Sequence, residues 1–432
     1  MKSHKYIYIV PFVTNKTIIF NGIDKTFFIV KNNDVSTYLS ILKRPNEYNA
    51  THENIIKKLK RFGFLIDQEI NEIDLLRQER SQYINYPEYK TTIVSTFECN
   101  YNCWYCVQKH EPVTISKEKI ELIKKHVVTY LKEEKIKSYV LSWFGGEPLM
   151  QPDMIEDISS YLKQFCENEG IEYSSAITTN GALLSRNVIL MLKRMKVNYY
   201  QIAIDGEAQE HNKIKKDKIN ASSFDLILGN IANLLALNEN ANVTLRINYT
   251  LKTLKSTQIV NDINKFIPED MRGRLVVDLQ KVWQVKEENI PIELLNKFQK
   301  ELTTNGYLLC TNHIFSMCYV DKRHYNMIYY NGGVEKCDKF KIDQLRGYID
   351  ESGYIKWKSN PIFPEYDVLA DDSICSKCNY YPLCYCDCPL SREKKIEEKG
   401  RIVCGYGSNS PKFEHRILDY CWRVINNNHI KV

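Results

Sequence analysis

Three cysteines on one short segment are the residues best suited to chemistry in this chain. Cys99, Cys103 and Cys106 have the spacing C-x3-C-x2-C, so a tight loop can bring their sulfurs together around one centre. Three thiolates on such a loop can hold three irons of a [4Fe-4S] cube and leave the fourth iron open to a ligand. A structural zinc site, which needs four closed ligands, is the alternative. The spacing therefore predicts a redox cluster with one open coordination position.

A second group of cysteines lies in the C-terminal region. The spacing is Cys318-x13-Gly332-x4-Cys337, then Cys375-x2-Cys378-x5-Cys384-x3-Cys388, and finally Cys404. Cys310, just upstream, is the candidate for an eighth ligand. The chain shows no secretion signal, and the cytosol keeps thiols reduced, so these cysteines predict metal binding and not disulfides. A pair of zinc sites, which C-x2-C alone would favour, is the alternative.

Three further cysteines fall outside both groups. Cys166 lies on an amphipathic segment and is expected to be a small buried hydrophobic residue. Cys386 stands between Cys384 and Cys388, so it could substitute for a neighbouring ligand. Cys421, near the C-terminus, is expected to have no ligand role.

Length and composition indicate a soluble globular chain with several domains. The 432 residues are 44% hydrophobic and 26% charged, with a formal net charge of +6. That charge is too small and too mixed to predict nucleic-acid binding. The longest apolar runs are far shorter than the roughly 20 residues that a membrane span needs. We therefore expect a cytoplasmic protein with no membrane and no nucleic-acid partner.

Strands and helices are predicted to alternate between about residues 90 and 310. The expected strands are Thr91 to Thr96, Tyr139 to Phe144, Ser174 to Thr178, Tyr199 to Ile204, Val243 to Thr250 and Leu275 to Trp283. Amphipathic segments between them predict six βα units and a parallel sheet. Parallel βα proteins place their chemistry at the carboxyl ends of the strands. The first cysteine loop follows the first of these strands. After about residue 310 the periodicity fades.

Polar and glycine-rich segments follow the next strands. They are Gly145-Gly146-Glu147-Pro148, Thr178-Thr179-Asn180-Gly181 and Asp205-Gly206, with His211 shortly after. Two glycines let a ligand approach the backbone, and a carboxylate beside them suits an ammonium group. On the fifth strand, Arg246 and Asn248 share one face because side chains alternate along a strand. Ordinary turns are the alternative for each segment, and a structural role at a helix start is expected for His211.

The first 85 residues predict a small β-rich module. Short strands are expected at Tyr6 to Val10, Thr17 to Phe20 and Phe27 to Val30, with turns at Asn21-Gly22 and Asn32-Asn33. A helix over Glu53 to Phe62, with Thr51 as N-cap and Gly63 as its stop, precedes a strand at Phe64 to Ile66. The charged segment Glu69 to Arg80 is expected to be a linker helix.

The first cysteine loop resembles the motif of the radical S-adenosylmethionine (radical SAM) superfamily, including an aromatic residue, Tyr105, before the last cysteine. The resemblance implies a partial (β/α)6 TIM-like barrel and a cluster that cleaves SAM to a 5'-deoxyadenosyl radical, which abstracts hydrogen from substrate. It implies catalytic roles for the three cysteines and for Asp205. The cofactor-binding residues that it implies are Tyr105, Gly145, Gly146, Glu147, Pro148, Thr179, Asn180, Arg246 and Asn248.

The C-terminal cysteines are similar to the SPASM domain, an extension of radical SAM enzymes that usually carries two auxiliary [4Fe-4S] clusters. The resemblance implies one cluster on Cys310, Cys318, Cys337 and Cys388, and another on Cys375, Cys378, Cys384 and Cys404. The chain would then hold three [4Fe-4S] clusters together with SAM. The domains expected are a recognition module with its linker at 1–85, a radical SAM barrel at 86–309 and an irregular SPASM domain at 310–432.

The N-terminal module resembles the winged-helix domain that captures leader peptides by strand addition in enzymes that modify ribosomal peptides. Our leading hypothesis is a peptide maturase that installs a carbon-carbon or thioether crosslink. Exposed Lys57, Lys58, Lys60 and Arg61 would favour an acidic leader. An electron donor such as flavodoxin or ferredoxin would be needed. The alternatives are an anaerobic sulfatase-maturase-like enzyme, which makes formylglycine, and a non-catalytic iron-sulfur protein.

Overall fold

The structure is a computed structural model that describes residues 1–48, 52–216, 222–285, 290–339, 342–358, 367–405 and 411–430. The chain divides into two compact units. Unit 1 comprises Met1–Asn85, Thr311–Arg323 and Pro361–Ile425, and unit 2 comprises Tyr86–Cys310, His324–Asn360 and Asn426–Val432. The three-domain division expected from the sequence stays a prediction. In the described part of the chain, no helix combines the length and apolar character needed to span a membrane.

Unit 2 is built on one large sheet. Its parallel strands, in spatial order, are β12 (Leu308–Leu309), β11 (Leu275–Lys281), β10 (Asn242–Tyr249), β9 (Val197–Ile204), β8 (Glu172–Thr179), β7 (Ser138–Phe144) and β6 (Glu88–Val94). The six predicted strands all form, and neighbours in sequence are neighbours in the sheet. The predicted α/β fold is therefore confirmed.

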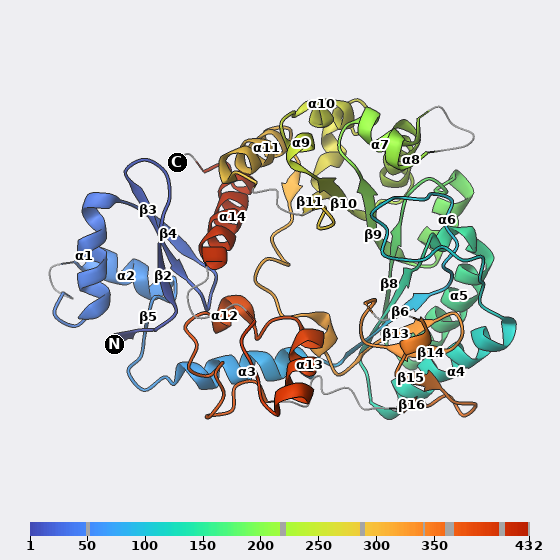
Figure 1. Ribbon diagram of the computed structural model, residues 1–432, viewed down its shortest axis with the longest axis horizontal. Coiled ribbons are helices and arrows are strands. Elements are labelled where there is room, and N and C mark those ends of the chain that lie inside the picture. The colour runs from blue at the N-terminus through green and yellow to red at the C-terminus, as the bar shows by residue number, and fades with distance from the viewer. Residues whose placement is uncertain are drawn as a thin grey trace. The chain divides into compact units, whose positions relative to one another are not determined.

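Helices follow the strands of unit 2 and cover one face of its sheet (Figure 1). They are α4 (Lys117–Glu133), α5 (Pro152–Glu169), α6 (Arg186–Arg194), α7 (Ala208–Ile214), α8 (Ser223–Leu237), α9 (Leu251–Leu254), α10 (Gln258–Asn264) and α11 (Ile292–Thr304), with short 3-10 turns at Pro148–Met150, Glu269–Arg274 and Ile342–Gln344. Helix α5 begins with a proline and ends at Gly170 in the left-handed conformation, the usual start and stop signals.

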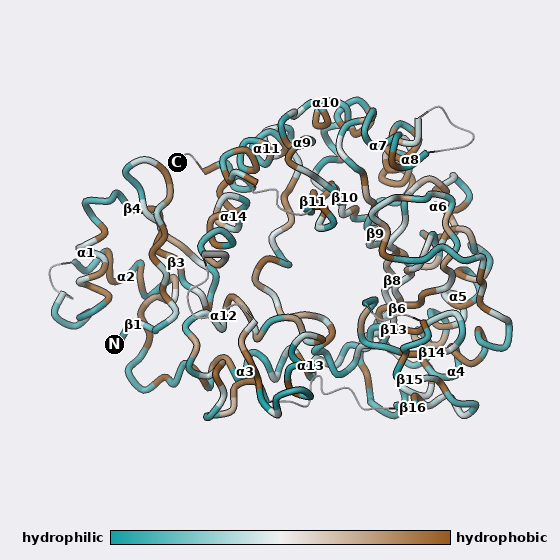
Figure 2. Tube along the Cα trace, viewed as in Figure 1, coloured by the Kyte–Doolittle hydropathy of each residue, from teal (hydrophilic) through white to brown (hydrophobic). Residues whose placement is uncertain are grey.

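Alternation along the strands explains how the core of unit 2 forms. On β7, Tyr139, Leu141 and Trp143 are buried, while the intervening residues point to the other face and stay partly accessible. Helix α5 supplies Ile155 and Ile158 to the same core, and α4 and α5 alternate between hydrophobic and hydrophilic colours along their length (Figure 2). Cys166 on α5 is fully buried in this core, as predicted. The face opposite the helices is therefore left for polar side chains.

The sheet of unit 2 continues beyond the predicted barrel. Strand β13 (Tyr325–Tyr329) pairs parallel with β6, and β14 (Gly333–Glu335), β15 (Gly347–Ile349) and β16 (Ile355–Trp357) follow in antiparallel order. The sequence periodicity fades after about residue 310, yet this segment still forms short strands. Strands of three to five residues are too short to show a period in sequence, and they are recognised only by their pairing, β13 with β6 and each later strand with the one before it.

Unit 1 opens with a three-stranded antiparallel sheet of β2 (Ile7–Pro11), β3 (Lys16–Asn21) and β4 (Phe27–Lys31). Helices α1 (Asn32–Lys43), α2 (Glu53–Arg61) and α3 (Glu72–Ile84) follow, and β5 (Leu65–Ile66) pairs with β1 (Lys2–Ser3). The predicted turn at Asn32-Asn33 is wrong, because these residues begin α1, and Asp34 in its first turn favours a helix start. Thr51, the predicted N-cap, lies outside the described residues.

The two ends of the chain share one core in unit 1. Helices α12 (Tyr381–Cys384), α13 (Pro389–Lys399) and α14 (Pro411–Asn427) belong to its C-terminal part. Val10 and Phe20 of the N-terminal sheet pack in one hydrophobic cluster with Phe315 and with Ile417 and Cys421 of α14. Cys421 is fully buried in this cluster, and its expected lack of a ligand role stays a prediction. Removing the N-terminal strands would therefore expose the core beneath the cysteine-rich segment.

Candidate active site

A cavity of about 320 Å³ lies at the carboxyl ends of the parallel strands in unit 2. Adjacent parallel strands end at the same edge of a sheet, so residues distant in sequence meet there. Of the predicted site residues, the cavity is lined by Cys99, Cys103, Tyr105, Cys106, Gly145, Gly146, Thr179, Asn180, Arg246 and Asn248. Glu147, Pro148 and Asp205 do not line it. In the glycine turn after β7, Gly145 and Gly146 therefore face the cavity, whereas Glu147 and Pro148 lie behind its wall.

The glycine turn after β7 is packed against the cysteine loop. The amide N–H groups of Gly146 and Glu147 donate to the carbonyl oxygens of Thr96 and Glu98, at 2.9 and 2.8 Å. A Cβ on Gly145 would lie 2.4 Å from the Thr96 oxygen, and one on Gly146 would lie 2.2 Å from the Glu98 oxygen. Both positions therefore require glycine, because the loop that carries the thiols approaches too closely for any side chain.

The Glu147 carboxylate is buried inside this turn. Its side chain is 0% exposed, and it accepts hydrogen bonds from Leu149 N–H at 3.0 Å, Thr179 Oγ1 at 2.7 Å and Asn180 N–H at 2.7 Å. Burial raises the pKa of Glu147, and the three donors oppose that rise. The carboxylate thus joins the end of β7 to the end of β8. Its predicted contact with the SAM amino group stays a prediction.

Asp205 lies behind the cavity in a buried polar network. It is 2% exposed and accepts hydrogen bonds from Tyr105 Oη at 2.6 Å and from Asn248 Nδ2 at 2.9 Å, and it is ion-paired with Lys215. Burial alone would raise the pKa of Asp205, but the Lys215 ammonium and the hydrogen bonds outweigh it and hold the pKa below its usual value. The carboxylate thereby fixes Tyr105 and Asn248, both of which line the cavity. A catalytic role for Asp205 stays a prediction.

The structure adds cavity residues that sequence reasoning missed. Lys215, Gln284, Asp338 and Lys339 line the same space. Lys215 stands in a run of lysines after α7, so its sequence context resembles that of a solvated surface. Only the tertiary structure distinguishes it, because its partner Asp205 lies at the end of a different element, strand β9. His211, expected to be structural, is fully buried and its Nδ1 accepts from the Asp205 N–H at 3.1 Å.

The donor set at this cavity fits a cluster with an open iron. Three thiols of one loop border the space, and donors approach the sulfurs: Asn180 Nδ2 lies 3.9 Å from Cys99 Sγ, and His110 Nε2 lies 3.4 Å from Cys106 Sγ. Hydrogen bonds to ligand sulfurs are a normal feature of iron-sulfur sites. The Arg246 guanidinium borders the same space, where it suits a carboxylate.

The auxiliary ligand sets are distributed over both units. Cys375, Cys378, Cys384 and Cys404, all in unit 1, line one small cavity of about 40 Å³, and Cys386 lines it as well. Of the other predicted set, Cys318 and Cys388 belong to unit 1, and Cys310 and Cys337 belong to unit 2. The ligand roles of all these cysteines stay predictions.

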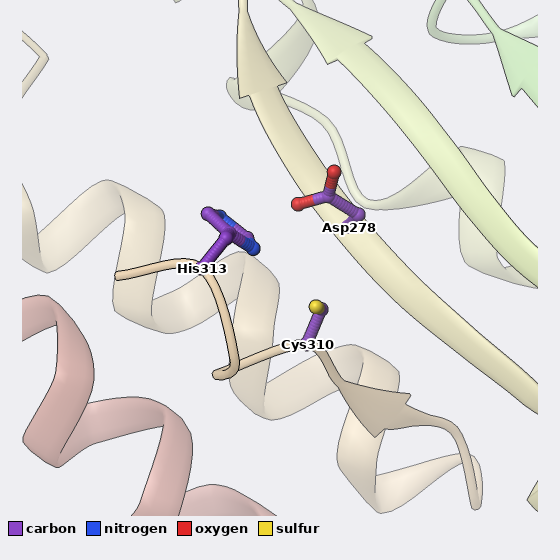
Figure 3. A group of neighbouring side chains, drawn as sticks. All are labelled: Asp278, Cys310 and His313. Atoms are coloured by element: carbon purple, nitrogen blue, oxygen red, sulfur yellow. The ribbon is translucent and has the colours of Figure 1, made fainter. Parts of the chain in front are cut away.

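Cys310 directly follows β12 and has a carboxylate beside it. Its N–H donates to the Val277 carbonyl at 2.8 Å, which places it next to Asp278 of the adjacent strand β11. Figure 3 shows the Asp278 carboxylate on the same side as the Cys310 thiol, and their ligand atoms lie within 4.8 Å. Sequence spacing did not reveal Asp278 as a neighbour of this cysteine.

Comparisons with known proteins agree with this geometry. Residues 93–254 match the Radical SAM superfamily. The chain is 26% identical over 302 residues to the radical SAM cyclopropyl synthase TigE of Paramaledivibacter caminithermalis, which covers 62% of this chain and 58% of that protein. It is 23% identical over 334 residues to a cysteine-type anaerobic sulfatase-maturating enzyme of Clostridium novyi, covering 68% of this chain and 86% of that enzyme.

Two solved structures share the fold. Native anSMEcpe with bound AdoMet and the Cp18Cys peptide superposes with a TM-score of 0.56 at 16% identity, over 80% of this chain and 100% of that chain. Streptococcus suis SuiB bound to its precursor peptide SuiA gives 0.50 at 14% identity, over 92% of this chain and 97% of that chain. Residues 93–254 therefore match a radical SAM domain, as the first cysteine loop predicted, and the chain shares the fold of these two solved structures. A radical SAM domain implies a [4Fe-4S] cluster and SAM.

Proposed function

We propose that this radical SAM enzyme matures a ribosomal precursor peptide and installs a carbon-carbon or thioether crosslink in it. Bound together, the cluster and SAM supply a hydrogen-abstracting radical, and oxidised auxiliary clusters supply a one-electron acceptor. The three [4Fe-4S] clusters would be held by the cysteine sets that the sequence predicts. Arg246 and Asn248 would bind the SAM carboxylate or ribose, and the polar ends of β8 and β9 would face SAM and substrate.

The main support for a peptide substrate is the unpaired edge of strand β2 in unit 1, as far as the described residues go. Within the described residues β2 pairs only with β3, and its other edge borders a hollow of about 540 Å³. Ile7, Ile9 and Tyr8 of the strand line this hollow. Lys5 and Lys377 add positive charge and Glu414 adds a negative one, and the predicted ligands Cys378 and Cys404 border the same hollow. An extended peptide can add to such an edge through its backbone, while the apolar and basic lining selects its side chains. The exposed basic residues of α2 would add to the attraction for an acidic leader.

Solved structures with the same fold support a peptide substrate. SuiB was crystallised with a precursor peptide, and anSMEcpe with a peptide and AdoMet. The sulfatase-maturating relative, whose length this chain covers to 86%, favours a second candidate function, the oxidation of one cysteine or serine to formylglycine. A crosslink removes two hydrogen atoms from the peptide, one by abstraction and one as a proton with an electron. Formylglycine formation also removes two hydrogen atoms: a serine alcohol becomes the aldehyde directly, and a cysteine thiol becomes a thioaldehyde that water hydrolyses to the aldehyde with release of hydrogen sulfide.

The test incubates short peptides, taken from any small reading frames found beside the gene of this chain, anaerobically with the reduced enzyme and SAM. Loss of two hydrogens by mass spectrometry, with a bond mapped by fragmentation, supports crosslinking. An aldehyde at cysteine or serine supports the alternative. Unmodified peptide and unchanged 5'-deoxyadenosine formation would contradict the proposal.

Docking at β2 is tested by point substitution, because truncation of the N-terminal strands would open the shared core of unit 1. Ile9→Ser removes a partly exposed side chain that lines the hollow, and Leu39→Ser on α1 is the matched control of similar exposure. We expect fluorescence anisotropy to show weaker peptide binding for Ile9→Ser alone. Equal affinity in both variants would place docking elsewhere.

A further inference from the structure

Two buried arginines in unit 1 share a single carboxylate. Arg80 of α3 and Arg392 of α13 are 5% and 4% exposed, and Asp321, at the end of the 3-10 turn Tyr319–Asp321, is 1% exposed. Arg80 Nη1 lies 3.2 Å from Asp321 Oδ2, and Arg392 Nη2 is ion-paired with Asp321 Oδ1. The group therefore carries a net charge of one positive unit in a place with little access to water.

This charge group is anchored next to two predicted cluster ligands. Asp321 lies one turn after Cys318, and its N–H donates to the Cys318 carbonyl at 3.0 Å. Arg392 lies one turn after Cys388, and its N–H donates to the Cys388 carbonyl at 2.9 Å. The ion pair between Asp321 and Arg392 therefore joins the two cysteine segments, which belong to the first predicted auxiliary set.

A cysteine of the five-cysteine cavity lies near the same charges. The Cys386 thiol is within electrostatic reach of both guanidinium groups, and it neighbours Cys375 of the second predicted set. Tyr381, which lines this cavity with Cys375 and Cys386, is within electrostatic reach of Arg80. Cys318 of the first predicted set is within reach of Arg392. The buried cationic group therefore lies near one member of the first set and near Cys386, which could substitute for a ligand of the second.

Each arginine has a buried donor without an acceptor. Among the described residues, Arg80 Nη2 and Arg392 Nη1 make no hydrogen bond although both atoms are inaccessible to solvent. An unsatisfied buried donor costs about 1–3 kcal/mol, and more when it is charged. Buried donors in native proteins are nearly always hydrogen-bonded, so a bound group, ion or water is expected to accept from these two. The acceptor has to be anionic or polar, and the sulfurs of thiolate-ligated iron-sulfur clusters are both.

We propose that Arg80 and Arg392 donate hydrogen bonds to sulfur atoms of the auxiliary clusters and raise the reduction potentials of these clusters. The inference rests on the proposed function, because it requires that the C-terminal cysteines hold iron-sulfur clusters. Reduction adds negative charge to a cluster, so a nearby buried positive charge favours the reduced state. A raised potential suits a cluster that takes up the electron left on the peptide during crosslinking. Arg80 and Arg392 are positioning residues in this scheme, since they act through the clusters.

The experiment is an EPR-monitored redox titration of the full, anaerobically reconstituted chain. The SAM-binding cluster is recognised by the change in its signal when SAM is added, and the remaining signals belong to the auxiliary clusters. For Arg392→Gln we expect auxiliary midpoint potentials that are more negative than in the wild type. Arg392→Lys keeps the charge but loses the planar fork, so it should shift them less. Arg77→Gln, on the same helix as Arg80 but paired with Asp371 at the surface, should leave them unchanged.

Asp321→Asn provides the opposite perturbation. It removes the negative charge and keeps both arginines, so the same potentials should become more positive. If the ion pair had only a structural role, both variants would lose iron or thermal stability. The midpoint potentials of the clusters that remain would then not shift in opposite directions in the two variants. If Arg392→Gln loses iron, the test rests on Asp321→Asn: a shift of its auxiliary midpoint potentials to more positive values supports the proposal, and no shift or a negative shift contradicts it.

The outcomes separate the inference from the proposed function. Full iron content with unchanged potentials in Arg392→Gln and in Asp321→Asn would overturn the role of the arginines alone. A wild-type chain that binds only the four irons of one cluster would overturn the auxiliary clusters themselves.

Discussion

Substitution of Glu147 tests the geometry of the active-site cavity most directly. Glu147→Ala removes an acceptor from two backbone N–H groups and from the Thr179 hydroxyl, all within a fully buried turn. Hydrogen bonds to a charged group contribute about 1.5–3 kcal/mol each, and the raised pKa of Glu147 shows that burial offsets part of this gain. We expect a net loss of about 3–4 kcal/mol in the free energy of unfolding of unit 2.

The same substitution should weaken SAM binding indirectly. Glu147 joins the glycine turn to Asn180, and both border the cavity, so a shift at this junction changes the lining. We expect the affinity for SAM to fall at least tenfold, which corresponds to about 1.4 kcal/mol. Glu147→Gln keeps the volume of the side chain but turns an amide N–H toward one of the donors. Its losses of unfolding free energy and of SAM affinity should therefore be smaller than those of Glu147→Ala.

Urea or thermal unfolding under anaerobic conditions, without SAM, measures the free energy of unfolding. Equilibrium dialysis with SAM measures the affinity for SAM. Glu172→Gln, at the exposed start of β8, is the matched control. Unchanged stability in Glu147→Ala would refute the hydrogen-bond argument. Normal stability with lost SAM binding would instead show that the carboxylate contacts SAM directly, as the sequence motif predicts.

Three further predictions follow from the structure of unit 2. Joint replacement of Cys99, Cys103 and Cys106 by Ala should lower the iron content by about four per chain and abolish 5'-deoxyadenosine formation; nucleoside still formed by this variant would show that catalysis lies elsewhere. Asp205→Asn leaves the Lys215 ammonium buried without its counter-charge, so the free energy of unfolding should fall by about 3 kcal/mol, whereas the exposed Asp270→Asn should not change it; a stable but inactive Asp205→Asn enzyme would favour a catalytic carboxylate. Burial lowers the pKa of His126 from 6.5 to about 4 and outweighs the hydrogen bond from Nδ1 to the Gly353 carbonyl, which acts to raise the pKa; Nε2 accepts from the Tyr89 hydroxyl. Since the unfolded chain binds the proton first, stability should fall as the pH drops from about 6.5 to about 4, by roughly 3 kcal/mol in total; an equal slope in His126→Gln, measured by unfolding at several pH values, would contradict this assignment.

Local spacing was sufficient to predict much of the active site. The C-x3-C-x2-C loop, the glycine turn and the polar residues on later strands each carry their signal within a few residues. Parallel strands end at one edge of their sheet, so strand order predicted that Gly146 and Asn180 would lie near the thiols, and the family resemblance added Arg246 and Asn248. The structure brings these four residues to one cavity with the thiols.

Other parts of the site depend on partners that sequence spacing cannot pair. Which side of a turn faces the cavity is set by packing, and Glu147 is directed inward by donors of the next strand and its own turn. Lys215 differs from its neighbouring lysines only because it reaches the end of β9.

The sequence by itself determined the chemistry of the chain, since thiol spacing and strand order are local properties. The tertiary structure alone decided how that chemistry is supported. Arg80 and Asp321 are 241 residues apart, and Asp321 and Arg392 are 71 apart, yet they form one buried group beside two cysteine segments. The short strands β13–β16 likewise become visible only through pairing, β13 with β6 and each later strand with the one before it. Long-range burial and charge pairing depend on which elements pack together, and no local pattern of residues encodes that choice.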